Sequence, residues 1–160
     1  MKLENREIVR LCHEQINNGN FEKALEFIAE DASNHGIKVG KAGYQMVWND
    51  IYKTFPDCRF ETEDILEAGD AVVVRATVRG THLGTGEFPV NGGMLIGVAP
   101  TGKSFEVQHI HWYKLREGKI FEHYANRDDM GMMQQLGLLP APEFSYADLE
   151  KPFEPTEENL

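Results

Sequence analysis

The stretch that most constrains the fold is residues 106–137, which reads EVQHIHWYKLREGKIFEHYANRDDMGMMQQLG. Alternating apolar and polar side chains predict a long strand over residues 105–115 and a returning strand over residues 120–127. Glu117-Gly118 predicts a tight turn between them, because glycine readily adopts the positive φ of hairpin turns. A short helix is predicted after Asp128-Asp129, since a carboxylate favours a helix N-terminus.

The same two-residue period begins earlier in the chain. Residues 60–66 and 71–81 alternate in this way, and Gly69-Asp70 between them suits a hairpin turn. Apolar residues at helical spacing precede these strands and predict three helices, over residues 4–17, 20–28 and 43–55. Helices followed by strands indicate an α+β fold, in which a curved antiparallel sheet wraps on three N-terminal helices as a cone with a pocket at its open end.

Length and composition fit one globular domain of 160 residues, 41% of them hydrophobic and 26% charged. The formal net charge of −10 argues against nucleic acid or an anionic membrane as a partner, because phosphate binding needs clustered lysine and arginine. The sequence has no run of about 18 apolar residues and no signal-peptide pattern. We therefore expect a cytoplasmic protein.

The chain is expected to divide into a folded domain over residues 1–139 and an acidic, proline-containing tail over residues 140–160. Cys12 and Cys58, the only cysteines, lack the spacing of a metal knuckle. Cys12 falls on the apolar face of the first helix, which predicts a buried and inert thiol.

Strand alternation places His109, His111 and Tyr113 on one face of the long strand. Two histidines at i and i+2 can bind a metal, but Glu117, the glutamate nearest to completing such a site, falls on the turn. We therefore expect no metal, and interpret one histidine as an acid–base or hydrogen-bonding group of the pocket and the other as structural. Asp128, at the end of the returning strand, is a candidate general acid or base and also a candidate cap of the last helix.

Three further features each have two interpretations. Arg75, between valines in mid-strand, lies either on an exposed sheet face or inside a polar cavity. The aromatic stripe of the third helix, which includes Trp48, either packs in the core or also forms a pocket wall. Residues 82–102, rich in glycine and proline with an apolar centre at residues 94–96, favour a lid or rim over a pocket.

Four segments within residues 5–139 form a specific set: FIAEDASNHG, FPDCRFETEDILEAGDAVVVRATVRGTHLG, APTGKSFEVQHIHWYKLREGKIFEHY and DDMGMMQQLG. As a set they resemble the SnoaL-like polyketide cyclases, also called ester cyclases, of the nuclear transport factor two-like superfamily. The resemblance implies a cystatin-like cone. It also implies aldol ring closure of a polyketide by an aspartate acid/base, without cofactor or metal. The active-site histidine and asparagine of the family fall on His111 and Asn34.

The sequence departs from the family at the aspartate, because Ala125 occupies that position. A second acidic position, three residues on, is kept as Asp128. Either Asp128 takes over the proton transfer, or the chemistry differs, or the protein is not catalytic. The loop over residues 82–102 is also longer than its counterpart in the family.

The first hypothesis is a cofactor-independent lyase or isomerase that cyclises, isomerises or dehydrates a hydrophobic, carbonyl-bearing small molecule. Asp128 would be its base, His111 the proton partner, and an asparagine or arginine the group that steadies the oxyanion. The candidate substrate-binding residues are Asn34, His35, Trp48, Arg75, His109, Tyr113 and Asn126.

Two alternatives use the same cone differently. One is a non-catalytic module that binds a hydrophobic ligand or dimerises, which the missing aspartate favours. The other is a hydrolase that adds water, with Arg75 or Arg127 between Asp128 and Asp129. In each case apolar side chains on both faces of the last two strands predict a homodimer, because one face would otherwise be exposed.

Overall fold

The computed structural model describes residues 3–89, 93–141 and 143. The elements are α1 (Asn5–Asn17), α2 (Phe21–Leu25), β1 (Ile28–Asn34), β2 (Ile37–Lys38), α3 (Gly40–Thr54), β3 (Arg59–Ala68), β4 (Ala71–Thr81), β5 (Ser104–Arg116), β6 (Lys119–Arg127) and α4 (Asp129–Gln135). The expected acidic tail lies outside the described residues apart from residues 140, 141 and 143.

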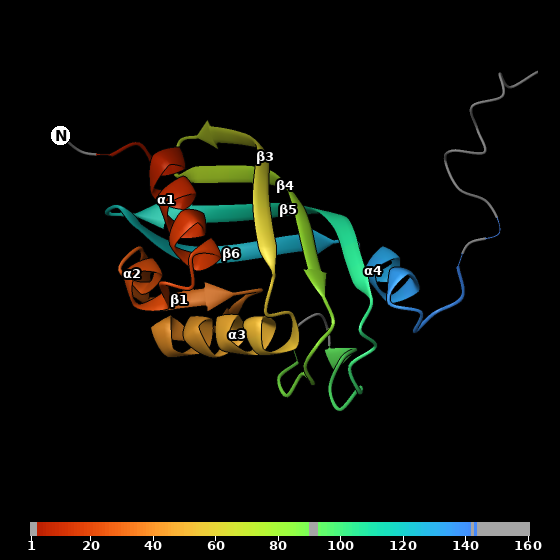
Figure 1. The fold of residues 1–160 in the computed structure, drawn as a ribbon. Coiled ribbons are helices and arrows are strands. Elements are labelled where there is room, and N and C mark those ends of the chain that lie inside the picture. The colour runs from red at the N-terminus through yellow and green to blue at the C-terminus, as the bar shows by residue number, and fades with distance from the viewer. Residues whose placement is uncertain (1–2, 90–92, 142, 144–160) are drawn as a thin grey trace, which may run out of the picture.

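The strands form one curved sheet in the order β2-β1-β6-β5-β4-β3. Neighbouring strands are antiparallel except β1 and β6, which run parallel. Figure 1 shows α1, α2 and α3 on one side of the sheet and α4 beside the start of β5 and the end of β6. The predicted α+β cone, with three N-terminal helices and a short C-terminal one, is confirmed.

Most element boundaries agree with the sequence pattern, and β1 is the main exception. The second helix was expected to continue to Ile28, but it ends at Leu25 because Ile28 begins β1. A tight turn follows β1. His35 and Gly36 both have positive φ, 51° and 79°, and form the two-residue turn between β1 and β2.

The hairpin of β5 and β6 contains an irregularity that decides which side chains face inward. Its turn falls at Glu117-Gly118, as predicted, and both residues have positive φ. Leu115 pairs with Ile120, but Lys114 pairs with Glu122, so Phe121 is an extra residue on β6. Such a bulge bends the strand and shifts the register by one residue from that point.

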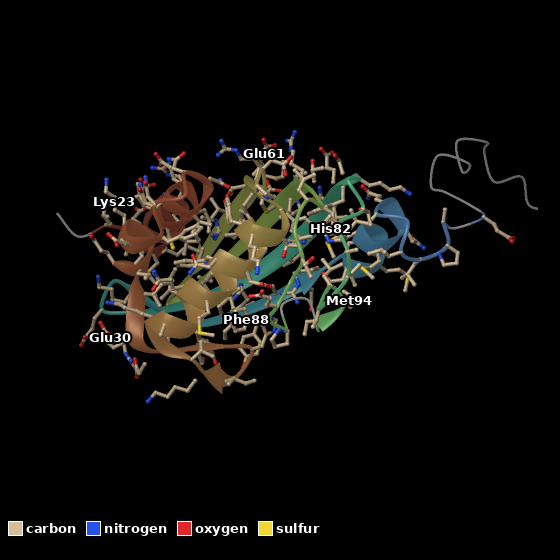
Figure 2. The ribbon with its side chains drawn as sticks, turned by 60° about the horizontal axis from the view of Figure 1, so that its bottom comes forward. Lys23, Glu30, Glu61, His82, Phe88 and Met94 are labelled. Carbon is tan, nitrogen blue, oxygen red and sulfur yellow. The ribbon has the colours of Figure 1, made fainter. Side chains whose placement is uncertain are left out.

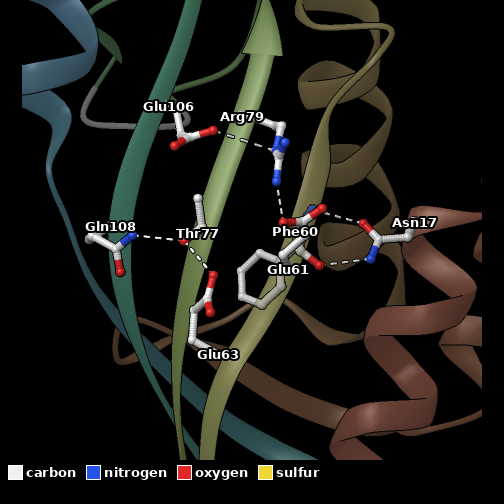
Figure 3. Close-up of polar contacts among 8 residues, drawn as sticks. All are labelled: Asn17, Phe60, Glu61, Glu63, Thr77, Arg79, Glu106 and Gln108. Atoms are coloured by element: carbon white, nitrogen blue, oxygen red, sulfur yellow. Dashed lines mark hydrogen bonds and ion pairs between the residues drawn. The ribbon is translucent and has the colours of Figure 1, made fainter.

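A single core fills the space between the helices and the concave face of the sheet. Inward residues of β4 and β5, such as Val72, Val74 and Val107, are buried, while their sequence neighbours face outward. Helix α1 is joined to the edge strand by Asn17, whose side chain donates to Phe60 O (2.8 Å) and accepts from Phe60 N (2.9 Å), as Figure 3 shows. This pair of hydrogen bonds fixes the end of α1 beside β3.

The outer face of the sheet is polar over β3 and β4 and more apolar over β5 and β6. Figure 3 shows the polar part, where Thr77 links Glu63 and Gln108 and where Arg79 pairs with Glu61 and Glu106. On β5 and β6 the exposed side chains include the large apolar ones of Ile110, Trp112 and Tyr124.

The long loop after β4 packs on the C-terminal half of α3. Leu83 N and Gly84 N donate to Thr54 O, and the buried carboxylate of Asp50 accepts from Glu87 N at 2.8 Å. Figure 2 shows His82 and Met94 on the far side of the molecule from Lys23. No helix in the described part of the chain is long and apolar enough to span a bilayer.

Candidate functional site

A cavity of about 160 Å³ lies between α1, α3 and the concave face of the sheet. Most of its wall is apolar, formed by side chains such as Ile16, Val47, Trp48 and Phe60. The polar lining residues are His13, Asn34, Tyr44, Tyr52, His109, His111, Tyr113, His123 and Arg127. Few polar groups in an apolar concavity are typical of a small-molecule site.

Three of the lining histidines form a continuous hydrogen-bonded row. His109 Nδ1 lies 3.3 Å from His111 Nε2, and His111 Nδ1 lies 2.8 Å from His123 Nε2. Asn34 ends the row, with its Oδ1 2.9 Å from His123 Nδ1. We refer to these three imidazoles and Asn34 as the histidine row. It spans β5, β6 and β1, and strand pairing alone brings its members together.

Two further polar side chains, His13 of α1 and Tyr113 of β5, contact the row. His13 Nε2 lies 2.7 Å from the hydroxyl of Tyr113, which itself lies 3.5 Å from His111 Nδ1. Phe60 packs against both His13 and His111, with ring centroids at 4.4 Å and 4.8 Å. The buried His13 Nδ1 has no hydrogen-bond partner among the described residues. The aromatic contacts keep the imidazoles in a dry, fixed arrangement.

Burial keeps these histidines neutral near pH 7. It lowers the pKa of His13 and of His109 to about 4, and that of His123 to about 3. The pKa of His111 also lies well below its ordinary value, first because of burial and then because of repulsion from the neighbouring imidazoles. Each ring therefore presents one N–H donor and one lone pair.

Arg127 supplies positive charge at the end of the row. It is the cross-strand partner of His109 and lines the cavity. Its Nε forms an ion pair with Asp129 Oδ1 at 3.5 Å. Burial raises the pKa of Asp129 in spite of this pairing. Burial is the main cause that lowers the pKa of His109, His111 and His123, and the charge of Arg127 adds to it. A guanidinium that lines the cavity favours a ligand that carries or develops negative charge.

Five of the candidate residues from the sequence lie at the cavity: Asn34, Trp48, His109, His111 and Tyr113. His109, His111 and Tyr113 share the inward face of β5, as strand alternation predicts. Trp48 is buried and also lines the cavity, so both interpretations of the aromatic stripe hold. The long loop was expected to form a lid or rim, yet none of its described residues lines the cavity.

Three other candidates lie elsewhere. The cavity alternative for Arg75 is wrong, because Arg75 is on the outer face and donates to Asp64 and Gln108. Asn126 faces outward opposite Ile110, because the extra residue Phe121 shifts the register of β6 by one residue. His35 is exposed in the β1–β2 turn, where its ring meets those of His123 and Tyr124 without lining the cavity.

Asp128 is exposed and caps α4. Its Oδ1 accepts a hydrogen bond of 2.8 Å from Gly131 N, which is the helix-cap interpretation of this residue. It is not among the cavity-lining residues, although its charge is felt by His109. Asp129 lies further inside and pairs with Arg127.

Sequence reasoning missed His13 and His123, and it considered Arg127 only for the hydrolase alternative. His13 follows Val9 by four residues on α1, a spacing that places both on the buried helix face. His123, Ala125 and Arg127 are alternate residues of β6, and their side chains share one face of the strand. Only the shifted register places that face inward. A signal for His13 was present, whereas the positions on β6 depended on the bulge.

The chain offers neither a clustered metal-ligand set nor a reactive thiol at this site. Within the described ranges, no group of three histidine, cysteine, aspartate or glutamate side chains is arranged to hold a metal ion. Both cysteines line the cavity, but burial raises the pKa of Cys12 and of Cys58 to about 12, so the thiols stay protonated.

Comparison with known proteins gives consistent matches. The family description "SnoaL-like polyketide cyclase" matches residues 6–136. Nogalonic acid methyl ester cyclase of Streptomyces nogalater is 28% identical over 76% of this chain and 89% of its own length. Aklanonic acid methyl ester cyclase AcmA of Streptomyces galilaeus is 29% identical over 81% of this chain and 88% of its own length.

Solved structures of similar proteins share the fold of this chain. The crystal structure of wild-type IdmH from Streptomyces antibioticus, a candidate polyketide cyclase, is 30% identical in sequence. It superimposes with a TM-score of 0.69 over 84% of this chain and 99% of that one. A SnoaL-like polyketide cyclase of Agrobacterium tumefaciens, at 18% identity and a TM-score of 0.70, shares the fold.

Proposed function

The chain belongs to the SnoaL-like polyketide cyclase family, and from that membership we propose that it cyclises a hydrophobic, carbonyl-bearing small molecule by proton transfer from its own side chains. Two of its relatives are named as cyclases of methyl esters, nogalonic acid methyl ester and aklanonic acid methyl ester. The proposed reaction begins with removal of a proton from a carbon beside a carbonyl and continues with attack of the resulting enolate on a second carbonyl.

The observation that carries this proposal is a hydrogen-bonded row of neutral imidazoles on the wall of an apolar cavity. The apolar wall supports binding of the carbon skeleton through burial. The imidazoles support proton transfer, because a neutral imidazole accepts a proton at one nitrogen and donates one at the other. His111, in the middle of the row, is the proton partner in this proposal.

The carboxylate of Asp128 is a weaker candidate for the base. It is exposed, it does not line the cavity, and it already accepts the hydrogen bond that caps α4. We therefore assign the proton transfer to the histidines and the capping role to Asp128.

The two methyl esters named for the relatives are the first substrates to test. The His111→Ala variant should lower turnover of aklanonic or nogalonic acid methyl ester at least about a hundredfold, the loss typical of a missing acid–base group. Gln108→Ala, on the outer face of the same strand, is the control and should turn over at the wild-type rate. Circular dichroism of both variants checks the fold, and unchanged turnover in folded His111→Ala would contradict the proposal.

One observation favours a second function, the binding of a hydrophobic ligand without turnover. Ala125 faces His111 across the strand pair, where the family aspartate is expected, and cannot transfer a proton. Binding of both esters by the wild-type protein with no conversion of either, measured by calorimetry and mass spectrometry, would support this second function instead.

A further inference from the structure

The histidine row has a direction, and this direction follows from its hydrogen bonds; the inference rests on the proposed function and deepens it. A neutral imidazole has one N–H donor and one lone pair. Each contact in the row joins the Nδ1 atom of one ring to the Nε2 atom of the next. In every contact one nitrogen must donate and the other accept, so all three rings carry their proton on the same type of nitrogen.

Asn34 decides which nitrogen that is. Its amide oxygen lies 2.9 Å from His123 Nδ1, and an amide oxygen only accepts hydrogen bonds. His123 therefore carries its proton on Nδ1 and accepts at Nε2 from His111. His111 in turn carries its proton on Nδ1 and accepts at Nε2 from His109. The free end of the row is the lone pair on His109 Nε2.

The surroundings agree with this direction. Nδ1 of His111 carries the proton donated to His123, so it has no lone pair for the hydroxyl proton of Tyr113, and this hydroxyl lies closer to His13 Nε2, at 2.7 Å. His109 lines the cavity, and its Nε2 has no hydrogen bond to any other described residue. The row therefore presents a proton-accepting atom where a ligand would sit.

Arg127 lies beside His109. It is paired with His109 across β5 and β6, so the two side chains leave the sheet on the same face from Cβ atoms about 5 Å apart. Its guanidinium carries several N–H donors, and the one contact described for it is the ion pair of Nε with Asp129. Donors next to a base are suited to hold the oxygen that gains charge as a neighbouring carbon loses its proton.

We propose that Asn34 sets the direction of the histidine row, so that His109 Nε2 takes the proton from the carbon beside a substrate carbonyl while Arg127 holds the carbonyl oxygen. The C–H bond breaks and an N–H bond forms on His109 Nε2. The electron pair of the C–H bond stays on the substrate as an enolate, and Arg127 holds the enolate oxygen. The Nδ1 proton of His109 shifts to His111, and that of His111 to His123, where Asn34 Oδ1 faces the new cation. After the enolate carbon bonds the second carbonyl carbon, the two protons shift back along the row to His111 Nδ1 and His109 Nδ1. The alkoxide then takes the proton from His109 Nε2, which leaves all three imidazoles neutral.

This assignment gives His109 and Arg127 catalytic roles and makes Asn34 a positioning residue. It also explains how the chain operates with Ala125 in place of an acidic side chain. The far end of the row lies at the parallel β1–β6 pair, so β1 contributes to the reaction through the contact of Asn34 with His123.

The test measures the proton positions directly. In the full chain labelled with ¹⁵N at histidine, two-bond ¹H–¹⁵N correlation spectra at about pH 7.5 distinguish rings protonated at Nδ1 from rings protonated at Nε2. Single histidine-to-glutamine variants assign the signals of the six histidines. We expect His109, His111 and His123 to be protonated at Nδ1, and the proposal fails if wild-type His109 is protonated at Nε2.

Two variants test the role of Asn34. Asn34→Asp keeps an oxygen acceptor and should keep the Nδ1 protons, whereas Asn34→Leu removes it and should move at least His109 to a mixture of both forms. Asn49→Leu, exposed on α3, is the matched control and should leave the spectra unchanged. Unchanged spectra in Asn34→Leu would overturn the role of Asn34.

The two proposals can fail separately. The spectra need no substrate, so reversed proton positions would remove the direction of the row and leave the turnover assay of the proposed function intact. Conversely, absence of turnover with the expected spectra would remove the reaction and leave the proton arrangement standing.

Discussion

Ala125 determines which polar partners the neighbouring histidines have. It lies opposite His111 on the same face of the sheet, and a methyl group there offers no hydrogen bond or charge. The histidines therefore have one another, Asn34 and Tyr113 as their polar partners. Buried imidazoles without a carboxylate neighbour remain neutral, and this neutrality links the site to the stability of the fold.

Stability should fall as the pH drops below about 6.5. The folded-state pKa of His13 and His109 is about 4 and that of His123 about 3, all below the value of about 6.5 expected in the unfolded chain. As the pH falls, the unfolded chain takes up protons first, so stability is complete above pH 7 and is lost between about pH 6.5 and 4. Each of these histidines should contribute a loss of about 1 kcal/mol between pH 7 and pH 5.5.

Urea denaturation at several pH values measures this loss. His13→Phe keeps a ring in the core and removes one of the titrating groups, so its free energy of unfolding should depend less steeply on pH than that of the wild type. Equal pH dependence in the two proteins would show that His13 is not held neutral in the folded state.

At the scale of elements, the sequence predicted the hairpins and helices but not the face of β6 that lines the cavity. Counting outward from the Glu117-Gly118 turn without an irregularity would pair His111 with Tyr124 and turn Asn126 inward. The extra residue Phe121 shifts the register by one, so Ala125 pairs with His111 instead. A bulge depends on how the strand bends over the core, and alternation alone contains no signal for it.

The same limit applies to residues that meet only through topology. His111 and Asn34 were found through a resemblance, whereas the contact between Asn34 and His123 requires the parallel pairing of β1 with β6. His35 shows the opposite case: it lies next to Asn34 in sequence, but the tight turn directs it away from the cavity.

Helix α4 should depend on Asp128 as its cap. Asp128→Ala removes the acceptor of Gly131 N and should lower the free energy of unfolding by about 1 kcal/mol. Asp128→Asn keeps a side-chain oxygen at the cap, so its loss should be only a few tenths of a kcal/mol. Urea denaturation of both variants checks the order, and equal losses would contradict capping as the role of this side chain.

At the scale of the whole molecule, the outer face of the sheet predicts a homodimer. Ile110, Trp112 and Tyr124 are exposed to 44%, 47% and 42% on adjacent positions of β5 and β6. Ion pairs cover the neighbouring strands, as in the pairs of Arg75 with Asp64 and of Arg79 with Glu61. An apolar strip beside a polar surface is suited to burial against a second copy.

Light scattering after size-exclusion chromatography tests this prediction. The wild-type chain should elute as a dimer, and Trp112→Glu should elute as a monomer because it places a charge in the buried strip. Leu66→Glu, at an exposed position of the edge strand β3, is the control and should remain dimeric. A monomeric wild type at micromolar concentration would rule out this interface.

The whole molecule thus combines an apolar cavity, closed by three helices, with one polar wall built from three strands. The central claim is that proton removal belongs to the histidine row of this wall and not to the carboxylate at the end of β6. Two substitutions separate these assignments, because His109 lines the cavity and Asp128 does not.

The most direct test is exchange of substrate hydrogen for deuterium in D₂O, followed by mass spectrometry of aklanonic or nogalonic acid methyl ester incubated with each protein. The wild type and Asp128→Asn should both catalyse exchange at the carbon beside the carbonyl, and His109→Gln should lose it at least about a hundredfold. Exchange that persists in His109→Gln and disappears in Asp128→Asn would contradict the account and return the proton transfer to the carboxylate.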